Sequence, residues 1–344
     1  MKQIEKIFDS EYIKALFYRK VMPFYPEFKE IKNLEIIPYK KHIWEGSYHI
    51  VVEIRTDFID DKGEEQYLPI FMTAHSHEPR RNVYDALEFL WENGFAGEHL
   101  AVPRPLFYHE YINATFYRGV TGHNLHYYLE NKNLAEIEMV VAQSAKWFAK
   151  LHAIKKLKNY IFNSENSRIR TVIPGVDKIL FHIAERYPHY AGFYERAYGI
   201  FIKNEEDFFN TTKKRWLIHG DAHPENIIKM SDIKIAAIDF TDMSVADFTR
   251  DLGCFLQQFE YMSTKCELGV DNISRIKQVF LDNYFANSKE KYNHKVQDRI
   301  DNYYNWTMMR TITYLLLSGV IKRDAERLEK INNTINSLRD NLGI

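Results

Sequence analysis

The stretch from Trp216 to Phe240 constrains this chain more than any other part of its sequence. Two apolar, strand-like runs flank a short polar loop, and that loop carries Asp221 and Asn226. A further acid, Asp239, ends the second apolar run. A carboxylate can orient or deprotonate a hydroxyl, and amide and carboxylate oxygens suit Mg²⁺. The stretch therefore has the residues needed to orient a hydroxyl, hold a divalent cation and present a nucleotide phosphate.

Each of these residues also has a purely structural interpretation. Asp221 follows a glycine and is typical of a turn, Asn226 of a helix cap or turn, and Asp239 of a strand end. Taken singly, these interpretations are at least as good as the functional one. The fixed spacing of His219, Asp221 and Asn226, followed by an Ile-Asp-Phe set in the next run, favours the functional interpretation of the whole loop.

The composition places few limits on the function. A chain of 344 residues can build a large core, and two lobes or domains are expected. The formal net charge is −1, so nothing steers the chain toward nucleic acid or an anionic membrane. No apolar run is long enough to cross a bilayer and the two cysteines indicate no disulfide framework, so we expect a cytoplasmic protein.

The hydrophobic period changes near residue 118. Before that point, after a helical stretch in residues 1–30, β-branched and aromatic runs predict strands, together with one amphipathic helix. The predicted strands are Leu34–Tyr39, Tyr48–Ile54, Tyr67–Thr73, Val102–Tyr108 and Ala114–Val120, and the helix is Arg81–Glu92. After residue 118 the pattern is mostly helical. The predicted helices are Asn124–Glu130, Leu134–His152, two within residues 175–212, Asp271–Asn287, Lys295–Ser318 and Asp324–Asn341.

The polar motifs resemble those of the aminoglycoside phosphotransferase and choline kinase-like family, a branch of the protein-kinase-like fold. That family carries His-Gly-Asp-x-His-x-x-Asn, and His219–Asn226 has this pattern. Ile238–Thr241 is similar to the Ile-Asp-Phe/Leu-Gly set of the family, and Asp247–Leu252 matches its later Asp-x-x-x-Asp-Leu pattern. The resemblance spans residues 34 to 256 and rests mainly on these three motifs.

The resemblance implies an α+β, two-lobed protein-kinase-like fold. Residues 1–118 are expected to form a nucleotide-binding N-lobe with a small antiparallel sheet and one helix. Residues 119–344 are expected to form a larger, mostly helical C-lobe with the catalytic loop and the acceptor site. The implied cofactors are ATP, or GTP, and Mg²⁺, and the implied partners are this nucleotide and a small molecule with a hydroxyl group.

The resemblance also implies roles for individual residues of the C-lobe. Asp221 is expected to be the catalytic base or hydroxyl orienter, and Asn226 and Asp239 are expected to bind Mg²⁺. His219 and Asp251 are expected to brace the catalytic loop without touching the substrate.

In the N-lobe, five residues are expected to contact the nucleotide, and one of them is Thr73 in the third predicted strand. Gly46 and Ser47 are expected to lie in the loop over the nucleotide phosphates. Residues near Arg118 and Val120 are expected to form the hinge against the base of the nucleotide.

The third predicted strand departs from the family pattern. The family carries there a Lys that pairs with the α/β-phosphates and with a Glu on the following helix. This chain has Thr73 at that position, with His75 as the alternative, and the strand contains no Lys. Three explanations stay open: Arg80 or Arg81 supplies the cation, the nucleotide is bound in an unusual way, or the protein is a relative with little catalysis.

The favoured function is an ATP- and Mg²⁺-dependent phosphotransferase that acts on a hydroxyl of an aminoglycoside-, choline- or sugar-like molecule. The alternative is a kinase-like protein that binds a nucleotide or another ligand with weak or no transfer. A kinase acting on protein Ser/Thr is disfavoured, because Gly220 stands where such enzymes carry the Arg of His-Arg-Asp. The segment between Asp239 and Asp251 is also too short for a long activation loop.

The acceptor site is expected among the helices that follow residue 120. The first candidates are Asp242, Glu260, Tyr261 and Trp306, and the further ones are Asp247, Gln257, Gln258, Tyr303 and Arg310. Acids suit an amine-bearing acceptor, and aromatic rings suit a quaternary ammonium group. Packing and surface roles are the competing interpretation of these residues, and it is the stronger one for the set as a whole.

Overall fold

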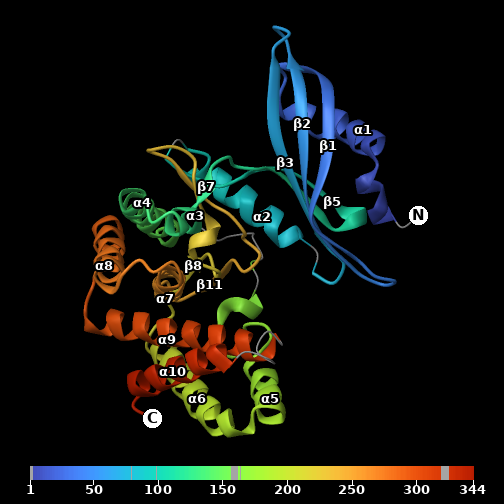
Figure 1. The fold of residues 1–344 in the computed structure, drawn as a ribbon. Coiled ribbons are helices and arrows are strands. Elements are labelled where there is room, and N and C mark those ends of the chain that lie inside the picture. Colours follow the sequence, from blue (N-terminus) through green and yellow to red (C-terminus); the bar gives the residue numbers. More distant parts are fainter. Residues whose placement is uncertain (1–2, 79, 98, 156–161, 163, 319–324) are drawn as a thin grey trace. The chain divides into compact units, whose positions relative to one another are not determined.

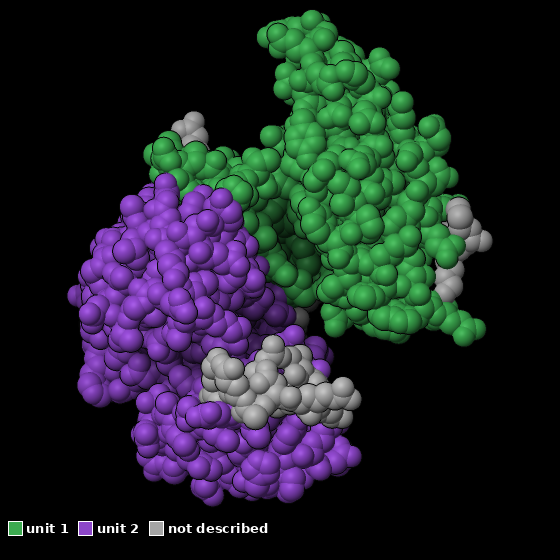
Figure 2. Space-filling model, in the orientation of Figure 1, with its two compact units in different colours: residues 1–123, 159–161, 228–241 green, residues 124–158, 162–227, 242–344 purple. Residues whose placement is uncertain are grey.

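The structure is a computed structural model that describes residues 3–78, 80–97, 99–155, 162, 164–318 and 325–344. The chain divides into two compact units, which are coloured separately in Figure 2. Unit 1 contains Met1–His123 and Ile228–Thr241, and unit 2 contains Asn124–Lys158, Phe162–Ile227 and Asp242–Ile344. Asp221 and Asn226 therefore belong to unit 2, whereas Asp239 belongs to unit 1.

Unit 1 is built around a five-stranded antiparallel sheet in the order β1-β2-β3-β6-β5 (Figure 1). Its strands are β1 Phe28–Ile43, β2 Tyr48–Asp60, β3 Glu65–His75, β5 Arg104–His109 and β6 Ala114–Arg118. Alternate residues of β2, such as Ile50, Val52 and Ile54, are fully buried, as the two-residue period of a strand requires. The helix α1, Ser10–Lys20, adds Phe17 to the same core.

The first three strands run further than the sequence pattern predicts. β1 begins at Phe28, whose ring stacks on Phe58 of β2 with ring centroids 4.7 Å apart. At the C-terminal end of β2, opposite Phe28, Oδ1 of Asp60 accepts the N–H groups of Lys62 and Glu64 and fixes the turn into β3. Aromatic packing and a polar turn therefore extend the sheet beyond the alternating apolar runs.

The helix α2, Arg81–Leu90, follows β3 and packs against β5 and β6. Its residues Leu87 and Leu90 are buried on one face, as expected for an amphipathic helix. The helix ends in a π-helical turn, η3 Trp91–Phe95, in which Gly94 adopts a φ of 90° that other residues rarely reach.

A second, four-stranded sheet has the order β4-β10-β9-β7. Its strands are β4 Leu100–Ala101, β7 His123–Asn124, β9 Ile227–Lys229 and β10 Ile235–Ala237. β10 pairs in parallel with β4, and this pairing draws Ile228–Thr241 into unit 1. Gly122 is needed here, because its φ is 143° and a Cβ would lie 1.9 Å from the carbonyl oxygen of Lys229.

Unit 2 is mostly helical. Its helices are α3 Leu125–Glu130, α4 Leu134–His152, α5 Val176–Arg186, α6 Pro188–Thr211, α7 Thr249–Lys265, α8 Val270–Asn287, α9 His294–Leu317 and α10 Ala325–Leu342. A two-stranded antiparallel sheet pairs β8, Trp216–Ile218, with β11, Ser244–Ala246. α7 packs so closely on α9 that a Cβ at Gly253 would lie 2.6 Å from the carbonyl oxygen of Ile300.

The α+β prediction is confirmed, and α1 lies within the helical stretch expected in residues 1–30. α7 is a helix that the sequence analysis did not predict. Almost every residue of its first half is buried, so it has no polar stripe to mark the helical period. Asp324, the predicted start of the last helix, lies outside the described residues. Within the described ranges, no helix is both long and apolar enough to span a membrane.

Candidate active site

A buried carboxylate, Asp251 at the start of α7, holds the loop that follows β8. Its Oδ2 accepts the N–H of His219 at 2.7 Å, and its Oδ1 accepts the N–H of Gly220 at 3.0 Å. Oδ2 also lies 3.1 Å from Nε2 of His152 at the end of α4. Burial opposes the charge of Asp251, but the hydrogen bonds from His152 and Gly220 outweigh it and keep the pKa of this carboxyl below its usual value. Asp251 thus joins three segments of unit 2 as an ionised group.

Gly220 allows the loop to turn tightly after β8. Its φ is 86°, a conformation that L-residues with a side chain rarely adopt. A Cβ at this position would lie 2.1 Å from the carbonyl oxygen of Asp242. The glycine therefore lets the loop approach the β11 segment and fixes the direction in which Asp221 leaves the backbone.

Asp221 is the acid that the loop presents. Its Oδ2 lies 3.4 Å from Nε2 of His223, and its side chain is 41% exposed. Burial alone raises the pKa of Asp221, but the imidazole of His223 and the neighbouring His219 and Arg310 outweigh it and place the pKa far below the usual value. Asp221 is therefore ionised at neutral pH and is a hydrogen-bond acceptor.

Asn226 is fixed against Asp221 by its amide group. It lies in the short turn η6, Pro224–Asn226, and is 7% exposed. Its Nδ2 donates to the backbone oxygen of Asp221 at 2.9 Å and to Oδ2 of the same residue at 3.3 Å. Because the nitrogen is engaged in this way, Oδ1 is the amide atom left to bind a cation.

Asp239 follows β10 in unit 1 and adopts a φ of 62°. Its Oδ1 accepts hydrogen bonds from the backbone N–H of Thr241 at 3.3 Å and from Oγ1 of Thr241 at 2.8 Å. Nδ2 of Asn82, on α2, donates to the carbonyl oxygen of Thr241 at 3.1 Å. Within unit 1, the turn that carries Asp239 is thus anchored to the first turn of α2.

Arg80 immediately precedes α2 and is 7% exposed. Its carbonyl oxygen accepts a hydrogen bond from Oγ1 of Thr115 on β6. Its Nη1 lies 3.5 Å from Oγ1 of Thr241 and 3.5 Å from Oε2 of Glu78. Among the described residues, Nε of Arg80 finds no hydrogen-bond partner although it is buried. Unit 1 therefore holds a buried guanidinium, incompletely paired, beside the turn of Asp239.

Neither Thr73 nor His75, the two residues of β3 that stand in place of the family's lysine, carries a charge. Thr73 lies in the middle of the strand and pairs with Val51 and Thr115. The ring of His75 accepts the N–H groups of His77 and Glu78 through Nδ1, and burial lowers its pKa. Arg80, by contrast, is a buried side chain of this region that is always charged.

Two other basic residues of this region, Arg81 and His49, do not provide a buried positive charge. Arg81 is exposed, and its Nε pairs with Oδ1 of Asp85 at 2.8 Å. Burial, together with the charges of Lys40 and Arg80, lowers the pKa of His49 to about 4, so this ring is neutral at pH 7.

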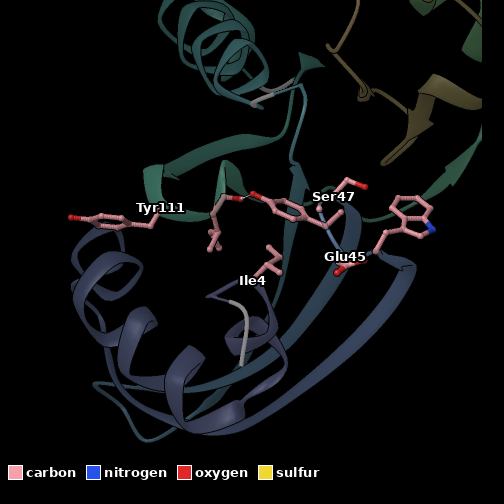
Figure 3. Close-up of a pocket in the computed structure, with 8 residues that line it drawn as sticks. Ile4, Glu45, Ser47 and Tyr111 are labelled. Atoms are coloured by element: carbon pink, nitrogen blue, oxygen red, sulfur yellow. Dashed lines mark hydrogen bonds between the residues drawn. The ribbon is translucent and has the colours of Figure 1, made fainter.

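The other predicted nucleotide contacts lie in two places of unit 1. Gly46 and Ser47 follow β1 and line a cavity of about 170 Å³, together with Ile4 and Tyr111 (Figure 3). Arg118 ends β6, and Val120 lies two residues beyond it. Between these two, Gly119 donates its N–H to the carbonyl oxygen of Pro69 at 2.8 Å.

A larger cavity, of about 530 Å³, lies entirely within unit 2. The loop from Gly220 to Glu225 forms one side, and α7 and α9 supply the rest. Asp221 lines this cavity together with Gln258, Tyr261, Lys265 and Arg310. Asp221 therefore lines a space large enough for a small molecule.

The predicted acceptor residues divide into two groups. Gln258, Tyr261 and Arg310 line the cavity. Trp306 is 1% exposed and packs in the core, and Glu260 pairs with Lys277.

Asp242 is likewise not part of the lining. It accepts a hydrogen bond from Nδ2 of Asn166. Burial and the nearby Asp221 carboxylate raise the pKa of Asp242. Sequence reasoning missed Lys265 and His223 as lining residues, because their place depends on how α7 and the loop pack.

The predicted metal ligands are one amide and one carboxylate. Within the part of the chain that the structure describes, no three His, Cys, Asp or Glu side chains form a cluster able to hold a metal ion. A Mg²⁺ ion bound by protein usually takes only one or two protein carboxylates and fills the rest of its shell with phosphate oxygens and water. The donor chemistry of Asn226 and Asp239 fits such an ion.

The sequence matches the phosphotransferase enzyme family over residues 57–269. This match covers more than half of the chain, so the chain belongs to that family and is a phosphotransferase. The resemblance predicted from the catalytic loop is confirmed. No curated protein matches the sequence.

Several solved structures share the fold. An ethanolamine kinase from Plasmodium vivax is 14% identical, with a TM-score of 0.56 over 95% of this chain and 87% of that chain. A choline/ethanolamine kinase family protein from Mesorhizobium loti is 12% identical, with a TM-score of 0.57 over 96% of this chain and 94% of that chain. An amicoumacin kinase is 12% identical, with a TM-score of 0.56 over 98% of this chain and 96% of that chain. At these identities the likeness establishes the two-lobed, kinase-like fold alone.

Proposed function

We propose that this protein transfers the γ-phosphate of ATP or GTP to a hydroxyl group of a small molecule, with Mg²⁺ as cofactor. The observation that carries the proposal is the position of Asp221. Its carboxylate stands on a loop that the buried Asp251 holds, and it lines a cavity of about 530 Å³. A cavity of this size suits a small acceptor, and Asp221 can accept the hydrogen bond of its hydroxyl.

The transfer step needs orientation more than strong base catalysis. Asp221 is a weak base because its pKa lies far below the usual value, so we assign it the role of aiming the hydroxyl. The hydroxyl oxygen forms the new bond to the γ-phosphorus while the bond from that phosphorus to the β-phosphate oxygen breaks. The nucleoside diphosphate leaves, and the hydroxyl proton passes to Asp221 late in the step.

Asn226 and Asp239 are the proposed Mg²⁺ ligands. The contacts of Asn226 leave Oδ1 for the metal, and Thr241 holds Oδ1 of Asp239, which leaves its Oδ2. Mg²⁺, when bound, neutralises charge that develops on the phosphates. Both residues are placed by hydrogen bonds within their own unit, which supports a role as fixed ligands.

Arg80 is the proposed substitute for the lysine that β3 lacks. A guanidinium keeps its charge when buried, and its planar donors match phosphate oxygens. The free Nε of Arg80 and its position beside Thr241 support this role. Thr73, Gly46 and Ser47 stay proposed contacts of the nucleotide.

Arg118 and Val120 stay the proposed hinge beside the nucleotide base. The amicoumacin kinase of similar fold was solved with AMP-PNP and Ca²⁺, which supports a nucleotide and a divalent cation here as well.

The absence of a lysine from β3 favours one competing function, a kinase-like protein that binds nucleotide without transfer.

One experiment separates these two functions. Thermal shift with Mg²⁺-nucleotide and release of nucleoside diphosphate are measured for the wild type and for Asp221→Asn, with aminosugars, amino alcohols, sugars and hydroxy acids as acceptors. A ligand that binds the folded state raises the melting temperature. We expect Mg²⁺-nucleotide to raise the melting temperature of both proteins, but only the wild type to release nucleoside diphosphate.

The exposed Asp177, in the first turn of α5, provides the matched control. Asp177→Asn is expected to behave as the wild type in both assays. A wild type that shifts with nucleotide but releases no diphosphate with any acceptor supports the binding-only function instead.

A further inference from the structure

The charged side chains of the larger cavity are separated into two sides. The loop side carries the acids Asp221 and Glu225. The helical side carries two cations, Lys265 in the last turn of α7 and Arg310 on α9. Of the described residues of α7 and α9 that line the cavity, none is acidic. The helical wall is therefore positive.

Arg310 is the cation best placed to bind a ligand. It is half-buried, and its guanidinium carbon lies 5.0 Å from the ring centroid of Trp306. Trp306 is 1% exposed, so the ring is a fixed support for the guanidinium. Within the described ranges, no side chain or carbonyl accepts a hydrogen bond from Arg310, and no carboxylate forms an ion pair with it at 4.0 Å or less.

Two carboxylates whose charge interacts with Arg310 have other partners. Asp221 is engaged by Asn226 and His223, and Asp242 by Asn166. Arg310 lines the same cavity as Asp221, and its charge lowers the pKa of both acids although no hydrogen bond joins it to either. The N–H donors of this planar, half-buried guanidinium thus remain available to bind a ligand in the cavity.

Lys265 adds a second positive charge to the same wall. Its Nζ lies 4.3 Å from the ring centroid of Tyr261, another lining residue. Tyr261 is therefore covered by a cation of the protein itself. An acceptor with an ammonium group meets two like charges on this wall, whereas one with an anionic group meets two donors of opposite charge.

We propose that the acceptor is a hydroxyl compound that also carries an anionic group, a carboxylate or a phosphate, and that Arg310 binds this group. Asp221 then orients the hydroxyl at the other side of the same cavity, and Lys265 supplements the positive charge. This inference rests on the proposed function for its reaction, but the binding of the anion does not require turnover. It replaces the amine-bearing acceptor that the sequence suggested, because neither Glu260 nor Trp306 lines the cavity.

The test compares acceptors that differ only in the anionic group. One arm uses glycerol against glycerate and glucose against gluconate, which probe a carboxylate. A second arm uses glycerol against glycerol 3-phosphate and glucose against glucose 6-phosphate, which probe a phosphate. Ethanolamine and kanamycin are the cationic comparisons. We expect at least one anionic acceptor to have the highest kcat/KM, and the arm in which it falls identifies the group.

Arg310→Gln is then tested with the preferred acceptor and its neutral partner. Hydrogen bonds to a charged group support a loss of about 10- to 150-fold in the ratio of their kcat/KM values, carried mainly by KM. Arg310→Lys keeps the positive charge but lacks the planar guanidinium, so it should restore part of the preference in kcat/KM for the anionic acceptor. The exposed Arg196 on α6 gives the control, and Arg196→Gln should keep the wild-type ratio.

A binding measurement keeps this inference apart from the proposed function. Thermal shift with the same anionic compounds is recorded for the wild type, Asp221→Asn and Arg310→Gln. We expect binding to survive in Asp221→Asn and to weaken in Arg310→Gln, even if no transfer occurs at all. The inference is overturned if neutral or cationic acceptors are preferred, or if no anionic compound binds. It is also overturned if Arg310→Gln lowers kcat equally for every acceptor, because Arg310 would then act on the transferred phosphoryl group.

Discussion

Replacement of Arg80 by methionine should weaken the binding of nucleotide phosphates without harming the fold. Arg80 is 7% exposed, its Nε has no partner among the described residues, and its two contacts through Nη1 are long, at 3.5 Å. A buried charge with incomplete pairing contributes little to stability, and an apolar side chain of similar length is often neutral or stabilising. We therefore expect the melting temperature of the nucleotide-free Arg80→Met protein to be unchanged or raised.

The same guanidinium should make charge-assisted hydrogen bonds once a nucleotide is bound. Such bonds are worth about 1.5–3 kcal/mol, which corresponds to an increase of about 10- to 150-fold in the Kd for Mg²⁺-ATP. Isothermal titration of ATP and of adenosine separates the phosphate contribution, since adenosine should bind both proteins equally. Arg81→Met is the matched control, because Arg81 is exposed and already paired with Asp85. A Kd for ATP that Arg80→Met leaves unchanged, with a clear fall in melting temperature, would refute the assignment and make Arg80 a structural residue.

Two further predictions concern the frame around the catalytic loop. Gly253→Ala should lower the free energy of unfolding by about 1–3 kcal/mol, because the new Cβ would lie 2.6 Å from the carbonyl oxygen of Ile300. Gly199→Ala on α6 meets no atom within 4 Å and should instead be neutral or stabilising, so denaturant unfolding of the two variants tests the close approach of α7 to α9. Asp251 has a lowered pKa in the folded state, so its stabilisation is present above the ordinary Asp pKa of about 4 and is lost as the pH falls through the folded value. The difference in unfolding free energy between the wild type and Asp251→Asn should therefore be constant above about pH 5 and shrink below about pH 4, and a difference that grows on acidification would contradict this sign.

Most of the fold could be predicted wherever one face of an element is polar. The helix Leu134–His152 was predicted with the bounds that α4 has, because its apolar residues recur at the helical period. α7 escaped prediction because it is buried on nearly all sides, and a helix without a polar face loses its periodic signal. The pairing of β10 with β4 also escaped, since both strands are only two or three residues long and they lie far apart in the sequence, with Ile235 opposite Leu100.

The local structure of the loop that carries Asp221 and Asn226 is more predictable than the packing of the residues around it. Asp221 and Asn226 are close in sequence, and their hydrogen bonds are local consequences of one short loop. The sequence leaves Arg80 as one of several alternatives, because its burial depends on β6 and on the turn after β10. Lys265 had no sequence signal at all, since it joins the cavity only through the packing of α7.

The most direct test of the account is to follow the γ-phosphate itself. Wild type and Asp221→Asn are incubated with γ-labelled ATP, Mg²⁺ and the acceptor that shows the highest kcat/KM among the compounds compared above. The label is then located in the products. The account predicts that the wild type places the label on a hydroxyl of the acceptor, and that Asp221→Asn binds ATP with similar affinity but transfers it at least 100-fold more slowly, an effect on the order of 3 kcal/mol in the barrier. Transfer at the same rate by both proteins would contradict the central role of Asp221.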